Sequence, residues 1–124
     1  MLLIDQKIFK RAKKGIKNCP FNLLFFQSLL KGSLSAENVY MNKSKYLNQE
    51  YMFIKSSLFI ENEFLWLIKI GVLRREVDGQ GLTSKVRITP IGRKVLESSS
   101  NLFNQKKSLL KKLMTCVKYR LSPR

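Results

Sequence analysis

This chain of 124 residues contains no histidine and only two cysteines. Without histidine it lacks the usual general base of nucleophilic triads and the commonest metal ligand. Cys19 and Cys116 lie too far apart for a zinc-binding spacing, and nothing in the sequence supports a disulfide between them. We expect both to be reduced, small apolar residues. The sequence therefore predicts neither an enzyme nor a metal site, and no cofactor.

Long apolar runs are also missing. The longest, such as Phe64 to Ile68, are too short to span a bilayer. At the N-terminus the lysines follow Leu2, Leu3 and Ile4 instead of preceding an apolar run, so no signal peptide is evident. Hydrophobic residues nevertheless make up 44% of the chain, which is enough for one modest core. We expect a globular cytoplasmic protein.

Acidic residues are scarce, because eight Asp and Glu stand against 24 Lys and Arg and give a net charge of +16. Such an imbalance indicates a polyanionic partner, most often nucleic acid and less often an anionic membrane surface. The alternative is that the lysines only keep the surface soluble. Residues 1–20 hold six basic residues and one acid, and residues 101–124 hold seven and none, whereas residues 61–97 are nearly balanced at seven against five.

The most regular pattern lies between Phe64 and Leu96. An apolar helix ends at Gly71, a residue suited to the left-handed position after a helix. Residues 72–77 and 82–88 read as two strands around the turn residues 78–81, with apolar and basic residues alternating in the second strand. Thr89 and Pro90 are typical of the start of a further helix, at residues 91–96. The predicted order is helix, basic hairpin, helix.

This order resembles the wing region of winged helix-turn-helix transcription regulators, such as the PadR-like and ArsR-like families. The residues that carry the resemblance, within about residues 58–97, are Phe64, Leu67, Gly71, Val72, Leu73, Arg74, Arg75, Asp78, Gly79, Ile88, Thr89, Pro90, Ile91 and Gly92. It implies an α+β winged helix-turn-helix fold, mostly helical with one two-stranded wing. Residues 58–70 would then be the recognition helix. Extra basic helices would lie at the N- and C-termini.

Two helices are expected before this region. Residues 2–16 form a basic amphipathic pattern that ends at Gly15 and at residues 18–20, and this helix either lies on phosphates or docks on the core with a solvated outer face. Residues 21–31 are apolar almost all round and predict a buried helix stopped by Gly32.

Residues 33–57 are the least informative. Ser35 is a candidate cap for a short helix through Met41, and residues 42–44 are loop-like. Leu47, Tyr51, Ile54 and Leu58 form a second helical stripe. The second helix of the helix-turn-helix is one of these two segments, and the sequence leaves the choice open.

The expected recognition helix departs from its family in one respect. Glu61 and Glu63 lie near its start, where carboxylates repel phosphates, although glutamate can accept from a cytosine amino group. Its small polar face consists of Asn62, Glu63 and Lys69, and Trp66 is typical of a core or subunit interface.

The C-terminal residues 102–120 form another basic amphipathic pattern. The resemblance implies that such a terminal helix supports a homodimer, and a basic helix on anionic lipid has the same pattern. The expected dimer contacts are Leu102, Leu109, Leu113 and Val117. The predicted parts of the chain are residues 1–20, the basic helix; residues 21–97, the winged-helix domain; and residues 98–124, the terminal helix.

The sequence thus predicts a nucleoid-associated protein that binds double-stranded DNA without catalysis, as a dimeric transcription regulator with no small-molecule cofactor and no membrane partner. The residues expected to contact phosphates or the minor groove are Arg74, Arg75, Lys85 and Arg87. Those expected near the major groove are Lys55, Ser56, Ser57 and Asn62. The alternatives are an RNA- or ribosome-associated protein, and a winged-helix module that binds protein or an anionic membrane.

Overall fold

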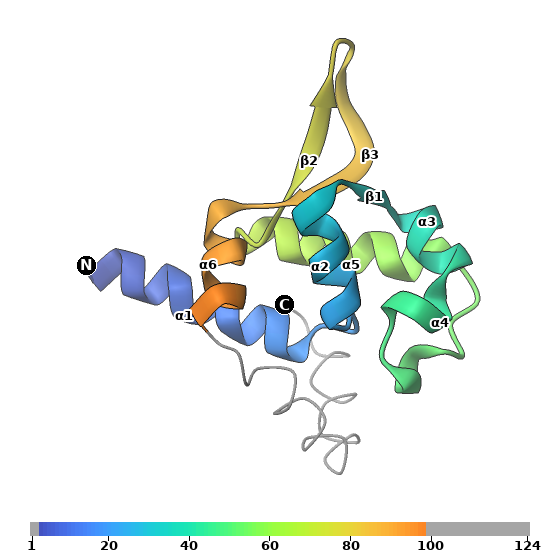
Figure 1. Cartoon of the computed structure of the whole chain (residues 1–124), viewed down its shortest axis with the longest axis horizontal. Helices are drawn as coiled ribbons and strands as arrows, with labels where there is room; N and C mark the ends of the chain where they lie inside the picture. The colour runs from blue at the N-terminus through green and yellow to red at the C-terminus, as the bar shows by residue number, and fades with distance from the viewer. Residues whose placement is uncertain (1–2, 99–124) are drawn as a thin grey trace.

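The computed structural model describes residues 3–98 as an α+β arrangement of helices around a small antiparallel sheet (Figure 1). The elements in chain order are α1 (Leu3–Asn18), α2 (Leu23–Lys31), β1 (Leu34–Ser35), α3 (Ala36–Met41), α4 (Lys43–Tyr46), the 3-10 helix η1 (Gln49–Tyr51), α5 (Ser57–Lys69), β2 (Leu73–Asp78), β3 (Gly81–Ile88) and α6 (Pro90–Ser98). The α+β class predicted from the sequence is confirmed.

The sheet has the strand order β1-β3-β2. Near its base, β3 pairs with both neighbours, since Val86 faces Leu34 of β1 and Arg75 of β2. The register between β2 and β3 shifts beside Glu76. The hydroxyl of Thr83 satisfies the backbone there, because it donates to the Glu76 carbonyl at 3.0 Å and accepts from the Lys85 amide at 3.2 Å. Beyond this point the hairpin projects from the body without other elements around it (Figure 1).

The core lies where α2 and α5 meet. Phe21, Phe25 and Phe64 are fully buried, and the Phe21 and Phe25 rings stack with centroids 4.2 Å apart. The Phe64 ring lies 5.5 Å from Phe21 and 6.0 Å from Phe25. Aromatic rings at these distances bury much apolar area and add a favourable pair interaction. They fix α5, the helix that leads into the hairpin, against α2.

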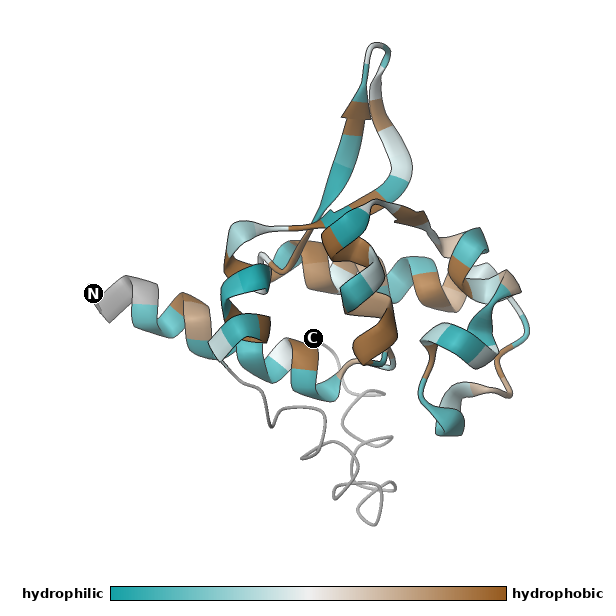
Figure 2. Cartoon of the chain, viewed as in Figure 1, coloured by the Kyte–Doolittle hydropathy of each residue, from teal (hydrophilic) through white to brown (hydrophobic). Residues whose placement is uncertain are grey.

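Helix α1 is docked on this core, with Ala12 and Ile16 fully buried. The prediction that Gly15 helps to end the helix is wrong, since α1 continues to Asn18. Gly15 instead allows close packing, because a Cβ there would overlap the side chain of Ile70. In Figure 2 hydrophobic and hydrophilic residues alternate along α1 and α6, as expected for helices with one face in the core.

The junctions around the hairpin match the prediction. Gly71 has φ +88, the left-handed conformation that favours glycine. The Thr89 hydroxyl accepts from the Gly92 amide at 3.0 Å and so caps α6, which begins at Pro90. Gly32 does end α2, although its φ of −170 is extended and not left-handed. Glycine is needed for its conformation at Gly71 but not at Gly32.

The segment between α3 and α5 differs from the prediction. Residues 47–58 do not form one helix, and α4 begins at Lys43, where a loop was expected. Leu47 is buried from an isolated bridge with Phe21, Tyr51 from a 3-10 turn and Ile54 from a segment without regular structure, and not from a continuous helical stripe. The predicted helix after Ser35 is confirmed as α3, whose cap pairs the Ser35 hydroxyl with the Asn38 amide at 3.0 Å. It is α3 that packs on α5.

Two further expectations concern the burial of α2 and the two cysteines. Helix α2 is not buried all round, since Leu23, Leu24 and Leu30 are exposed. Cys19 is buried, and its thiol donates to the Ile16 carbonyl at 3.1 Å, while Cys116 lies outside the described residues. Within residues 3–98 no helix is long and apolar enough to cross a membrane.

Candidate nucleic-acid interface

The hairpin has two faces with different partners. Alternation along β2 puts Leu73 and Arg75 on the face towards α5, and Arg74 and Glu76 on the outer face. On the inner face the Arg75 guanidinium pairs with the Glu61 carboxylate of α5 and also donates to the Ser84 carbonyl at 2.9 Å. The Arg75 side chain is only 17% exposed. Arg75 therefore holds the hairpin against α5 and is not presented to solvent.

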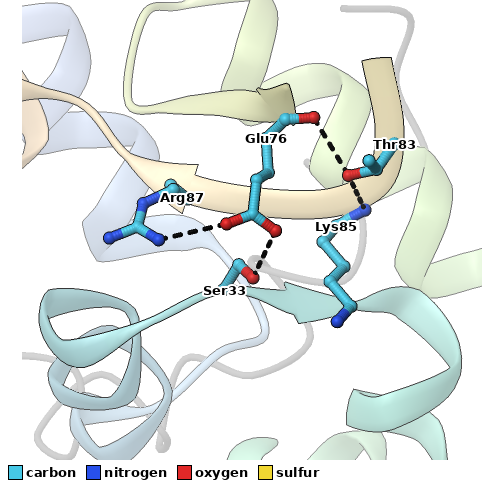
Figure 3. Close-up of polar contacts among 5 residues, drawn as sticks. All are labelled: Ser33, Glu76, Thr83, Lys85 and Arg87. Carbon is cyan, nitrogen blue, oxygen red and sulfur yellow. Dashed lines mark hydrogen bonds and ion pairs between the residues drawn. The ribbon is translucent and has the colours of Figure 1, made fainter. Parts of the chain in front are cut away.

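The outer face carries three cations, Arg74, Lys85 and Arg87, and Figure 3 shows the last two beside the Glu76 carboxylate. Arg74 and Arg87 are directly opposite on the two strands, and Lys85 lies two residues from Arg87 on the same face. Like charges in such positions repel. The Glu76 carboxylate offsets this repulsion, since it accepts from the Arg87 guanidinium at 3.2 Å and from the Ser33 hydroxyl at 2.8 Å. Arg74 and Lys85 remain exposed.

The electrostatics of Glu76 reflect these contacts. The Ser33 hydrogen bond first, and then the hydrogen bond and charge of Arg87, hold the pKa of this carboxyl below its usual range, and the charge of Lys85 adds to the effect. Because Ser33 precedes β1, Glu76 ties β2 to both β1 and β3. No sequence pattern predicts this role, since Ser33 and Glu76 are 43 residues apart.

Helix α5 presents a different surface from the predicted one. Its exposed face, repeating at helical spacing, consists of Leu58, Asn62, Leu65 and Lys69. The two leucines are 64% and 51% exposed. The prediction that Glu63 belongs to the polar face is wrong, because Glu63 is only 6% exposed and faces the core. The prediction that Trp66 is a core residue agrees with its half-buried packing on the core cluster.

The residues expected near the major groove lie at the start of α5. Lys55 and Ser56 are exposed, Ser57 is half-buried, and Ser56 occupies the cap position without a side-chain cap hydrogen bond. Asn62 lies further along on the exposed face. The structure thus brings Arg74, Lys85 and Arg87 together on one face of the hairpin, and it places Arg75 on the other.

A second group of cations was not among the predicted contact residues. Among the α1 side chains whose exposure the structure describes, residues 6–18, the exposed ones are Gln6, Lys7, Lys10, Arg11 and Lys14. Helix α6 packs against α1 and adds the exposed Arg93 and Lys94. The helical spacing of the basic residues within 2–16 predicts the cationic face of α1 from the sequence alone. The placement of the α6 cations beside this helix depends on tertiary packing.

Two remaining expectations concern the dimer contacts and a metal site. The expected dimer contacts, Leu102, Leu109, Leu113 and Val117, lie outside residues 3–98 and stay a prediction. Among the described residues, no group of three His, Cys, Asp or Glu side chains could hold a metal ion.

A protein-family model, described as Npun_F0494-like, matches residues 2–119. The match includes α1, the hairpin and α6 together, and so covers both groups of cations. No curated protein and no solved structure matches the chain. The inference of function therefore rests on the residues and their geometry.

Proposed function

The chain belongs to the Npun_F0494-like family, and we propose that it is a winged-helix protein that binds duplex DNA as a transcription regulator. The observation that carries this proposal is the order of its elements. Helix α5 runs through Gly71 directly into a projecting basic hairpin, and β3 of that hairpin pairs back with β1. This is the arrangement expected of a recognition helix followed by its wing, and α3, which packs on α5, would be the second helix of the motif.

Phosphate contact is assigned to the outer face of the hairpin. Arg74 and Lys85 are exposed there, and Arg87 is held in place by Glu76. Contacts of cations with phosphates position a protein on the duplex without reading its sequence. On α5 the exposed face offers Asn62 and Lys69 as polar groups between two leucines, so base reading by this helix is limited. The proposal is therefore of binding dominated by charge.

A second candidate function is protein binding through α5. Leu58 and Leu65 are exposed on one face of this helix, and such leucines are more typical of a protein contact than of a base-reading helix. The two candidates differ in salt dependence, because phosphate contacts release counterions and apolar contacts do not.

The test is binding of a fluorescent duplex in a series of salt concentrations. We expect the logarithm of the affinity to fall steeply with the logarithm of salt, and Arg74→Gln with Lys85→Gln to make the slope shallower by about 1.8. The matched control is Lys31→Gln with Lys45→Gln, which removes the same charge from exposed positions on α2 and α4. If the two double variants lose affinity equally, the hairpin is not the contact surface. If wild type binds no duplex, the proposed function is wrong.

A further inference from the structure

We propose that α1 and α6 form a second surface for the phosphate backbone of duplex DNA, so that one chain bridges two duplex segments. This inference rests on the proposed function, because one of the two duplex segments is the one that the hairpin binds. The second surface is defined as the exposed cations of the two helices. They are Lys7, Lys10, Arg11, Lys14, Arg93 and Lys94.

The α1 part of this surface is a single helix face. Lys7, Lys10, Arg11 and Lys14 are spaced three and four residues apart and are all exposed, while Ala12, at 0% exposure, is on the opposite side. At a rise of about 1.5 Å per residue, the four cations extend over roughly 10 Å. This row matches the scale of a DNA backbone, which carries one charge per strand for about every 3.4 Å of helix axis.

The helix that carries the row is held firmly. Ala12, Gly15 and Ile16 are buried, and Gly15 comes so close to Ile70 at the end of α5 that no side chain fits between them. The α1 cations therefore project from a docked helix of the body and not from a loose arm. Their positions are fixed before any partner arrives, which lowers the cost of ordering them on binding.

Among residues 3–98, positive charge is concentrated on these two helices. Together α1 and α6 contain eight basic residues and two acidic ones, whereas residues 19–89 contain nine and six. The excess is thus six charges on the two helices and three on the much longer stretch between them. In that stretch Arg75 and Arg87 are already paired with Glu61 and Glu76. Within residues 3–98 the larger excess of positive charge, and with it the stronger attraction for a polyanion, therefore lies on α1 and α6.

The two surfaces point in different directions. The buried face of α1 is turned towards α5 and α6, so its cationic face points away from the body. In Figure 1 the hairpin projects from the top of the molecule, and α1 runs along its lower side. With this arrangement we expect a straight duplex held by the hairpin to leave the α1 row uncovered, so that a chain using both surfaces holds two segments of DNA.

The residue types on α1 favour duplex backbone over single strands. Single-strand binding proteins combine cations with exposed aromatic rings on which bases stack. Among the α1 side chains that the structure describes, the exposed ones are Gln6 and the four cations, and Phe9 is half-buried. This face can neutralise phosphates but offers no ring to a base.

The experiment is a bridging assay with the full chain. One duplex of mixed sequence is fixed to beads, a second fluorescent duplex is in solution, and the amount captured by the protein is measured at low salt. We expect wild type to capture the second duplex. Lys7→Gln, Lys10→Gln and Arg11→Gln together should reduce capture to the level without protein, while binding of a single duplex through the hairpin persists.

The matched control is a pair of double variants: Lys31→Gln with Lys45→Gln removes two charges from exposed positions outside both surfaces and outside α5, and should leave capture unchanged, whereas Lys7→Gln with Lys10→Gln removes two charges from α1 and should reduce capture. Circular dichroism confirms that each variant is folded. If wild type binds one duplex but captures no second, the bridging inference is wrong and the proposed function stands. If the α1 variant still captures, bridging arises from another surface, such as a dimer, and the inference is wrong. If wild type binds no duplex but its α1 surface binds vesicles of anionic lipid, both proposals are wrong.

Discussion

The hairpin and helix α1 are both rich in basic residues, but they present them differently. On the hairpin, Arg75 and Arg87 are paired with Glu61 and Glu76, and only Arg74 and Lys85 are exposed. On α1 the described exposed face is made of cations and one glutamine. A projecting ribbon has little core to hold it, so its charges are partly used to fix its orientation. A docked helix is oriented by its buried face, and its cations lie on the exposed face.

The difference shows why a count of basic residues does not locate an interface. The hairpin residues from Leu73 to Ile88 contain four cations and two carboxylates, and a third carboxylate reaches them from α5. Paired cations have less electrostatic attraction left for phosphate than exposed ones. The comparison predicts that the same substitution has different effects in the two regions.

The largest expected effect concerns the docking of α1. Ile16→Ala should lower the free energy of unfolding by about 2–5 kcal/mol, because Ile16 is fully buried and its removal leaves a cavity. Urea unfolding measures this loss. On the exposed face of the same helix, Lys10→Ala should change stability by less than about 0.5 kcal/mol. Equal urea midpoints for the two variants would mean that α1 is not packed on the core, which would contradict the difference drawn between α1 and the hairpin.

A smaller effect is expected within the hairpin, where adjacent arginines have opposite roles. Arg75→Gln should cost about 1 kcal/mol of stability, because it breaks a partly buried pair and leaves Glu61 without its cation. Arg74→Gln should leave stability unchanged or slightly higher, since it removes repulsion with Arg87.

In DNA binding we expect the opposite ranking, with the larger effect from the substitution of Arg74 and the smaller from that of Arg75. Arg74→Gln is expected to make the salt slope shallower by about 0.9, whereas Arg75→Gln should change it less. Chemical denaturation and duplex titration on the same two variants measure both quantities. A stability loss for Arg74→Gln as large as that for Arg75→Gln would contradict the assignment of the two faces.

The smallest effect is a pH dependence at Glu76. Its pKa is lowered in the folded state, chiefly by the Ser33 hydrogen bond, so the carboxylate stabilises the fold above the unfolded-state pKa, and this contribution is lost as pH falls through the folded-state pKa. Ser33→Ala should therefore be less stable than wild type near pH 6, and the gap should close as the pH is lowered past that pKa. Urea midpoints from pH 6 to pH 3 measure the gap.

The control for this prediction is Ser56→Ala. Ser56 caps α5 without a side-chain cap hydrogen bond, so its replacement should give no stability difference that varies with pH in this range. If the gap between wild type and Ser33→Ala is the same at pH 6 and pH 3, the contact of Ser33 with Glu76 does not depend on the carboxylate charge.

The sequence by itself determined the elements whose signals are local. Gly71, the turn after Asp78 and the Thr89-Pro90 pair specify the ends of α5, the hairpin and the start of α6, because each depends on the backbone preferences or side-chain reach of a few adjacent residues. The Ser35 cap could be predicted for the same reason. The amphipathic pattern of α1 could be predicted from its helical period, but the sequence left open whether this helix docks on the core or lies on phosphates. The +16 charge likewise follows from composition alone.

Only the tertiary structure decided which side chains are buried, paired or exposed through contacts between residues distant in sequence. Residues 47–58 have a helical stripe, yet burial of Leu47 and Tyr51 against the core is achieved by short turns, since tertiary packing overrides a weak local preference. The burial of Glu63, the pairing of Arg75 with Glu61, and the joining of Ser33, Glu76 and Arg87 depend on contacts between residues distant in sequence. The charge of a residue can be read from the sequence, but whether that charge is paired or exposed depends on what the fold brings beside it.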